Sequence, residues 1–294
     1  MSSAPTSAGG PHTRPMSPST PAGLVVRTYI GGQVDVLNRA IARTQRHEPG
    51  SVALTRVSAH RIRTAVRGYR HLFADAPYGG PQLDRLMDAL EHTEELEALC
   101  THFDDRFDQL DLTVAEYPRW YTALRAEQEA AYRQIDRISA QTWVAALLGQ
   151  VRVFADRADF TDDGRKPAVS LMGTLTRSKT HLLDMYARLR YAEDLTDARE
   201  EVRRIARDTR AMAEAVRPAL GRPADDVIVP VTGLERLLEQ HRQSAVARNW
   251  LLRLPGADRA GRLGARLTDL EQQRLRQLGD ETDAAAAAMA EAWS

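Results

Sequence analysis

One histidine and three arginines are spaced so that a single helix would present them together. His60, Arg63, Arg67 and Arg70 stand at relative positions 0, 3, 7 and 10, with no acidic residue between them. Because an α-helix turns about 100° per residue, the four side chains would fall within an arc of roughly 80°. Stacked like charges destabilise a helix unless an opposite charge lies against them. The spacing therefore predicts an anion-binding surface on this helix.

A related arrangement recurs 140 residues later. Arg203, Arg207 and Arg210 match the three arginines, whereas Glu200 stands at the position of the histidine. Both segments end at breaks containing Gly and Pro, and both precede a further long helical segment. We interpret the repeat as a duplicated helical unit, whose two basic stripes could face each other across a shared axis.

Further candidate anion contacts lie beside the second stripe. Lys179 belongs to the preceding helical segment, and His241 and Arg248 belong to the following one. The pKa of His60, about 6.5 in model peptides, would rise beside an anion and add a positive charge. Alternatively, the first stripe could pair with the acidic segment 83–110, and the second with the carboxylates near it in sequence.

Composition excludes several classes of function. The 294 residues include 40 basic and 40 acidic ones, and this neutral balance argues against a general nucleic-acid binder, as does the aromatic content of 6%. Cys100 is the single cysteine, so no internal disulfide is possible, and a cytoplasmic location is expected. Its acidic segment would raise the pKa of the thiol. No apolar run approaches the ~18 residues of a membrane span, and no metal, nucleotide or nucleophile motif is present.

Helical periodicity runs through almost the whole chain from residue 24 onward. Residues 1–22 are rich in Ser, Pro, Gly and Thr and are predicted to form a disordered leader. We predict an all-α fold. The predicted helices are 24–46, 55–73, 83–110, 113–136 with an interruption near Pro118, 141–154, 169–191, 195–220, 231–254 and 259–293.

The order of these elements resembles the CHAD domain, the "conserved histidine α-helical domain". The family pattern Y-x-x-x-Q is similar to Tyr29 and Gln33, and V-H-x-M-R-V-x-x-R-R-L-R is similar to the stripe that begins at His60. In the second half, the pattern R-P-x-x-G is similar to Arg217-Pro-Ala-Leu-Gly221. The segment 238–248 resembles the stretch L-G-x-x-Q-D with V-A-R. The resemblance extends from about residue 24 to about residue 254.

The resemblance implies an all-α fold of two pseudo-symmetric antiparallel helical bundles, 23–160 and 161–294, packed around a central basic groove. It implies a non-catalytic domain that binds inorganic polyphosphate through the basic residues of this groove. Composition and motifs give no reason to expect a cofactor, a metal, a nucleic-acid partner or a membrane, and a cytoplasmic location, with association at polyphosphate granules, is expected. The expected polyphosphate contacts are His60, Arg63, Arg67, Arg70, Arg203, Arg207, Arg210, Lys179, His241 and Arg248.

Several positions depart from the family pattern. Gly68 and Asp208 stand where the family has arginine, Glu200 where it has its second histidine, Ala211 where it has tyrosine, and Gln243 where it has aspartate. Acids at 200 and 208 would oppose a phosphate chain. The alternative is therefore a degenerate CHAD protein that acts as a helical protein-interaction scaffold without binding polyphosphate.

Overall fold

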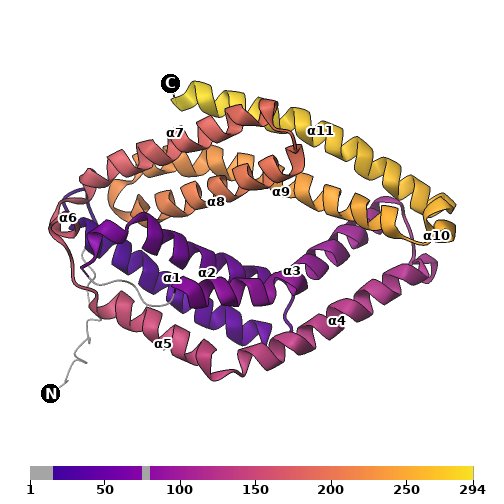
Figure 1. Ribbon diagram of the computed structural model, residues 1–294, viewed down its shortest axis with the longest axis horizontal. Helices are drawn as coiled ribbons and strands as arrows, with labels where there is room; N and C mark the ends of the chain where they lie inside the picture. The colour runs from indigo at the N-terminus through magenta and orange to yellow at the C-terminus, as the bar shows by residue number, and fades with distance from the viewer. Residues whose placement is uncertain (1–15, 75–79, 294) are drawn as a thin grey trace, which may run out of the picture.

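Helices make up nearly all of the computed structural model, which describes residues 16–74 and 80–293 (Figure 1). Within these ranges no strand forms, and only two isolated bridges link extended residues, so the all-α prediction is confirmed. The helices are α1 (Ala22–Thr44), α2 (Ser51–Gly68), α3 (Gly80–Gln109), α4 (Arg119–Ser139), α5 (Thr142–Arg157), α6 (Asp162–Arg165), α7 (Met172–Arg188), α8 (Leu195–Leu220), α9 (Arg222–Arg253), α10 (Gly256–Ala260) and α11 (Arg262–Trp293).

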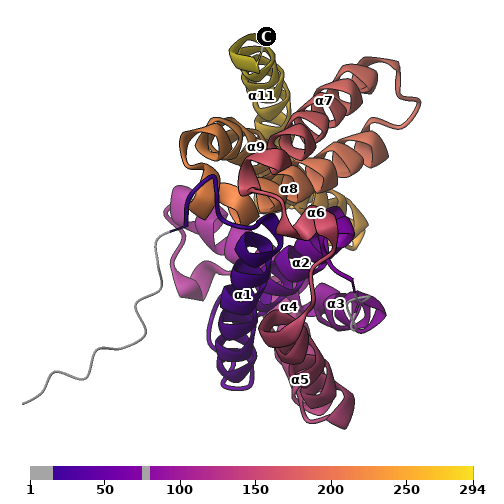
Figure 2. The same ribbon diagram turned by 90° about the vertical axis from the view of Figure 1, so that its left-hand side faces the viewer.

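The helices divide into two groups that follow the order of the chain. Helices α1 to α5 lie on one side of the molecule, and α7, α8, α9 and α11 lie on the other (Figures 1 and 2). The two groups meet at two junctions, where α2 packs on α8 and where α3 packs on α9. The space between these junctions is where a groove can form.

The helix boundaries follow glycine and proline, with two clear departures from the predicted set. Helix α2 spans Ser51–Gly68 rather than residues 55–73, so Arg70 lies in a short 3₁₀ turn (Arg70–Leu72) and the prediction that one helix carries the whole stripe is wrong for this residue. Gly221, at φ +59°, separates α8 from α9, and this positive φ suits glycine. Helix α9 begins at Arg222 rather than at residue 231, because Pro223 occupies the first turn, where its missing N–H costs nothing. Pro230 is accommodated inside the helix.

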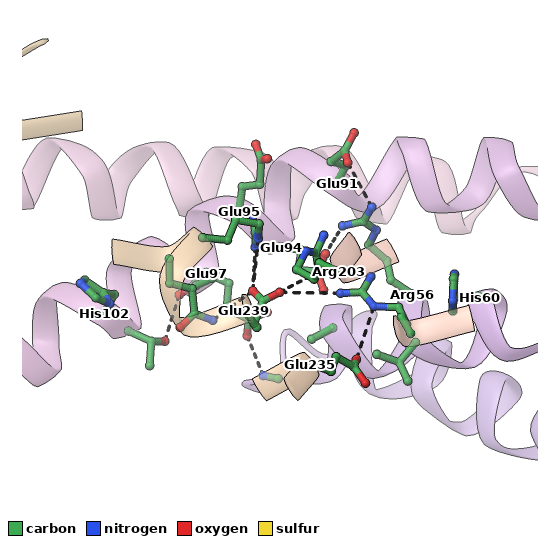
Figure 3. A pocket seen from close by; sticks show the side chains of 18 of the residues that line it. Arg56, His60, Glu91, Glu94, Glu95, Glu97, His102, Arg203, Glu235 and Glu239 are labelled. Carbon is green, nitrogen blue, oxygen red and sulfur yellow. Dashed lines mark hydrogen bonds and ion pairs between the residues drawn. The ribbon is translucent and has the colours of Figure 1, made fainter. Parts of the chain in front are cut away.

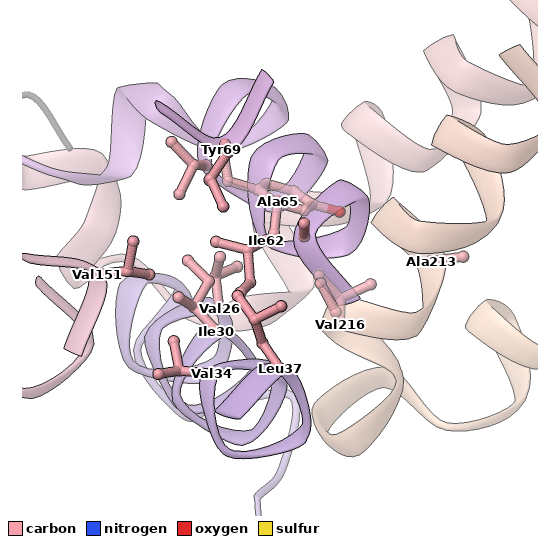
Figure 4. Close-up of a cluster of buried hydrophobic side chains, with 14 of the residues drawn as sticks. Val26, Ile30, Val34, Leu37, Ile62, Ala65, Tyr69, Val151, Ala213 and Val216 are labelled. Atoms are coloured by element: carbon pink, nitrogen blue, oxygen red, sulfur yellow. The ribbon is translucent and has the colours of Figure 1, made fainter. Parts of the chain in front are cut away.

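One hydrophobic core is shared by both groups of helices (Figure 4). Ile30 of α1, Ile62 of α2 and Val216 of α8 are all fully buried in it. Burying an aliphatic side chain of this size contributes roughly 1.5–3 kcal/mol. The α2–α8 junction is therefore held chiefly by apolar packing.

The other junction has its own aromatic core and a buried ion cluster. Phe103 of α3 packs against Trp120 of α4 and Trp250 of α9. Beside them the fully buried Glu271 of α11 accepts hydrogen bonds from the His102 and Arg106 side chains at 2.8 and 2.6 Å. Burial alone would raise the pKa of Glu271, but these two hydrogen bonds outweigh it and lower the pKa to about 2. This cluster fastens α3 to α11.

The beginning of the described chain is attached to the connection between α6 and α7. Backbone hydrogen bonds join residues 18–22 to residues 166–169 of this connection. Residues 1–15 of the predicted leader lie outside the described residues. None of the described helices combines the length and apolar character needed to cross a membrane.

Candidate functional site

A cavity of about 1020 Å³ lies between the α2–α3 wall and the α8–α9 wall. Its lining holds six arginines, namely Arg56, Arg61, Arg203, Arg207, Arg210 and Arg242. It also holds nine carboxylates, namely Glu91, Glu94, Glu95, Glu97, Asp105, Glu200, Glu214, Glu235 and Glu239. Carboxylates therefore outnumber guanidinium groups in the lining of this cavity, and the structure does not show the predicted central basic groove.

The cavity brings together part of the predicted site. Its lining includes four predicted residues, His60, Arg203, Arg207 and Arg210. It does not include Arg63, Arg67, Arg70, Lys179, His241 or Arg248. Contact of any of these residues with phosphate stays a prediction.

Packing between α2 and α8 explains why most of the first stripe lies outside the cavity. The Tyr69 hydroxyl donates to the backbone oxygen of Met212 at 2.9 Å. The Met212 methyl group lies only 2.8 Å from where a Cβ on Gly68 would stand, so the absence of a side chain allows this close approach. The two helices thus touch beyond Arg61, and the cavity ends there.

The remaining arginines of the first stripe have other surroundings. Arg63 donates to the Asp84 carboxylate at 2.7 Å, so the acidic-segment alternative holds for this residue. Arg70 donates to the backbone oxygen of Phe73 at 2.6 Å. Arg67 is exposed at the surface. Arg63 also donates to His60, which lies beside Asp208 of α8, so the Arg63 charge stays close to that helix.

Two of the three candidate residues outside the stripes, Lys179 and His241, are accounted for by local contacts. The Lys179 ammonium lies 4.9 Å from the centre of the Trp293 ring, a cation–π arrangement. His241 accepts a hydrogen bond from Arg199 at 3.0 Å. Burial, and then the charge of Arg199, lowers the pKa of His241 to about 4, so it is neutral at pH 7. The Nε of Arg248 is buried without a partner.

His60 has both ring nitrogens occupied. Arg63 donates to Nδ1 at 3.2 Å, which assigns the ring hydrogen to Nε2. This Nε2 lies 3.1 Å from the Asp208 carboxylate, which also accepts from Thr64 at 2.6 Å. Burial lowers the pKa of His60 although Asp208 opposes the shift. His60 is therefore a neutral link between α2 and α8.

The arginines of α8 and the glutamates around them form a continuous alternating series, which we call the ion-pair ladder. Its weakest part is Arg207, whose guanidinium makes only loose ion pairs and whose Nε, 3.6 Å from Glu235, has no hydrogen-bond partner. In order, the ladder runs Arg61–Glu214 at 2.9 Å, Glu214–Arg210 at 2.9 Å, Arg210–Glu235 at 2.8 Å, Glu235–Arg207 at 3.6 Å, Arg207–Glu239 at 3.7 Å, Glu239–Arg203 at 2.7 Å and Arg203–Glu200 at 2.8 Å.

The two remaining cavity arginines are paired in the same way (Figure 3). Arg56 of α2 binds Glu91 at 3.2 Å and also contacts Glu94. Arg242 binds Glu239 at 2.9 Å. Each of the six cavity arginines thus has a glutamate partner, and six of the nine carboxylates are used in this pairing.

The pKa shifts agree with charged, paired groups. Burial alone would lower the pKa of Arg203, but Glu200 and Glu239 outweigh it and raise the pKa. Burial would raise the pKa of Glu239, yet Arg242 and Arg203 lower it. Burial and the charge of Arg203 lower the pKa of the loosely held Arg207.

Three carboxylates of the cavity form no ion pair within the described chain. They are Glu95, Glu97 and Asp105, all on α3. Glu97 accepts hydrogen bonds at Oε1 from the Gly50 backbone and the Tyr132 hydroxyl, at 2.6 and 3.0 Å. Its charge therefore stands at the N-terminus of α2, where the helix dipole favours an anion. Its Oε2 is buried with no partner.

The model of one protein family, the CHAD domain, matches residues 28–252 of this sequence. The chain belongs to the CHAD domain family. Its fold is similar to "PptA from Streptomyces chartreusis", with 20% identity, a TM-score of 0.65, and coverage of 93% of this chain and 99% of that one. It is also similar to the CHAD domain from the plant Ricinus communis, with 14% identity, a TM-score of 0.68, and 97% of each chain covered. No match was found among curated proteins.

Within this CHAD domain, the residues that sequence reasoning missed are mainly the partners of the arginines. Glu235 and Glu239 are four residues apart, and so are Arg203 and Arg207 on the preceding helix. The sequence offered a signal for this pairing, because oppositely charged residues have the same four-residue spacing on two consecutive antiparallel helices. Arg56 stands one helical turn before His60, on the same face, and was detectable in the same way.

Proposed function

We propose that this CHAD protein is a non-catalytic helical scaffold whose central cavity does not bind inorganic polyphosphate. The carrying observation is that each of the six cavity arginines, within the ion-pair ladder or beside it, already has a carboxylate partner. A polyanion gains affinity mainly when free cationic groups replace its condensed counterions. Because the guanidinium groups of the cavity are already paired and three further carboxylates lie beside them, a polyanion would gain little affinity there.

A thermal-unfolding experiment tests this proposal. Long-chain polyphosphate is added to the protein at low and at high salt. A ligand at about a hundred times its dissociation constant would stabilise the fold by about 2.7 kcal/mol. We expect no stabilisation at either salt concentration. A rise in the melting temperature at low salt that disappears at high salt would contradict the proposal.

The second candidate function is polyphosphate binding in the cavity. Arginines from α2 and α8 converge on this one cavity, and the resemblance to the CHAD domain family implies polyphosphate as a ligand. If it holds, replacing Arg56 and Arg207 with glutamate removes the thermal stabilisation. The matched control is Arg204→Glu, since Arg204 lies on the exposed side of α8 and pairs with Glu201. Equal binding by both variants would place the ligand outside the cavity.

A further inference from the structure

A smaller cavity, of about 390 Å³, lies where the end of α7 and the beginning of α8 meet α11 (Figure 1). It shares no lining residue with the central cavity, and its volume suits a small molecule. Three of its lining residues are charged, namely Arg190, Arg199 and Asp283. Two guanidinium groups and one carboxylate leave one net positive charge. The cavity therefore has the charge to accept a monoanion, whereas carboxylates are in excess in the central cavity.

Arg199 is the partly buried cation of this smaller cavity. Its Nη1 donates to Nε2 of His241 at 3.0 Å, and this histidine is neutral at pH 7, so it does not compensate the guanidinium charge. Among the described residues no carboxylate pairs with Arg199, unlike the six arginines of the central cavity. Its Nη2 has no hydrogen-bond partner in the described chain and is not buried. This nitrogen is therefore an accessible donor with an uncompensated charge.

The space beside Nη2 is left by Gly279 of α11, which also lines the cavity. A Cβ at this glycine would stand 3.9 Å from Nη2 of Arg199, at ordinary contact distance, and would meet no other side chain within 4 Å. The carboxylate of the cavity, Asp283, accepts a hydrogen bond from the Tyr186 hydroxyl at 2.7 Å and forms no ion pair with Arg199. A ligand oxygen can therefore approach Nη2 from the side of α11.

The lining also offers a second cation and an apolar wall. Nε of Arg190 donates to the backbone oxygen of Ala187 at 3.1 Å, and its guanidinium lies 5.4 Å from the centre of the Tyr191 ring, so no carboxylate neutralises it. The apolar wall includes Leu189 and Leu195, and 48% of the Leu195 surface is exposed. Covering exposed apolar surface is favourable in proportion to its area. A ligand with both an anionic and an apolar part would use both features.

We propose that this smaller cavity binds a small molecule that joins one carboxylate to an apolar chain. The carboxylate accepts a hydrogen bond from Nη2 of Arg199, and Arg190 adds a second positive charge at the exposed edge of the cavity. The apolar chain covers Leu195. One bound monoanion balances the net charge of the lining. The proposal goes beyond the scaffold function and does not depend on whether the central cavity binds polyphosphate.

A ligand-observed NMR titration with four probes tests the ligand class. Hexanoate carries both the carboxylate and the chain, hexanol lacks the charge, acetate lacks the chain, and inorganic phosphate is an anion without a chain. We expect saturable binding of hexanoate, and binding of each other probe at least about tenfold weaker, the effect of losing a charged hydrogen bond or the apolar contact. No saturable binding of hexanoate, or equal binding of any other probe, would overturn the proposal.

Variants locate the site. Gly279→Leu keeps every charge of the cavity and fills the space beside Nη2, and leucine favours a helix more than glycine does, so the fold should be kept. We expect Gly279→Leu and Arg199→Gln each to weaken hexanoate binding at least about tenfold. The matched control is Arg204→Gln, which removes an exposed arginine of the same helix outside the cavity and should leave binding unchanged. Circular dichroism verifies helicity, and unchanged hexanoate binding by folded Gly279→Leu and Arg199→Gln would overturn the assignment.

Discussion

The stripes that begin at His60 and at Glu200 carry three arginines each at matching positions, yet the two stripes have different surroundings. In the α8 stripe, Arg203, Arg207 and Arg210 all line the central cavity, and each is paired with glutamate. Of the α2 stripe, only His60 lines the cavity, and its ring is occupied by Arg63 and Asp208. Equal spacing thus places side chains on one face of a helix, but the neighbouring helices decide what that face meets.

The neighbours differ in both packing and charge. Helix α8 runs along α9, whose Glu235 and Glu239 repeat at the interval of the arginines. Helix α2 instead approaches α8 so closely at Gly68 that the cavity ends before Arg67 and Arg70. The arginines of the α8 stripe are paired with glutamates, and α2 closes the cavity at Gly68. In the described chain, no continuous basic surface therefore remains between the α2–α3 wall and the α8–α9 wall of the cavity.

The largest expected difference between the two helices is in stability. Arg203→Ala should lower the free energy of unfolding by about 2–3 kcal/mol, because it removes charged hydrogen bonds of a largely buried guanidinium, leaving Glu200 without its partner and Glu239 with only Arg242 and the loose contact to Arg207. Arg67→Ala, an exposed change on α2, should stay within about 0.5 kcal/mol. Urea denaturation of both variants measures this. Equal losses would show that the ladder contributes no more than a surface charge.

A smaller effect is expected where the two helices are joined by Asp208. Asp208→Asn should cost about 1–2 kcal/mol at pH 7, since the charged hydrogen bonds to His60 and Thr64 are weakened. These hydrogen bonds lower the pKa of Asp208 although burial opposes them. The stabilisation is therefore present above the ordinary pKa of 3.8 and is lost as pH falls below it.

Denaturation of the Asp208→Asn variant and of the original protein between pH 7 and pH 2 measures this dependence. The difference in unfolding free energy should shrink towards the acid end. The exposed Asp162→Asn change serves as the charge-matched control. A difference that stays constant with pH would mean that the Asp208 charge does not matter.

The smallest effect is expected at Gly68. Gly68→Ala should change the free energy of unfolding by no more than about 1 kcal/mol, because alanine favours the helix by about that amount while the Met212 side chain must move aside. Thermal unfolding measures the change. A loss above about 2 kcal/mol would show that the contact between α2 and α8 cannot adjust.

The helical fold and the family could be predicted from the sequence, because hydrophobic periodicity and the breaks at proline and glycine are properties of short stretches of chain. It placed Arg203, Arg207 and Arg210 on one face, which the structure bears out. It could not reveal that this face meets Glu235 and Glu239, since pairing depends on how α9 returns along α8. Nor could it indicate that Gly68 closes the cavity, because that contact joins residues more than 140 positions apart.

The central claim is that Glu235 and Glu239 neutralise the arginines that would otherwise hold a polyanion. Calorimetric titration of the original protein and of the Glu235→Gln/Glu239→Gln double variant with long-chain polyphosphate at low salt tests it most directly. We predict no binding to the original protein, and binding to the variant with an affinity that falls steeply as salt is raised. Binding to the original protein as tight as that to the variant would contradict the account.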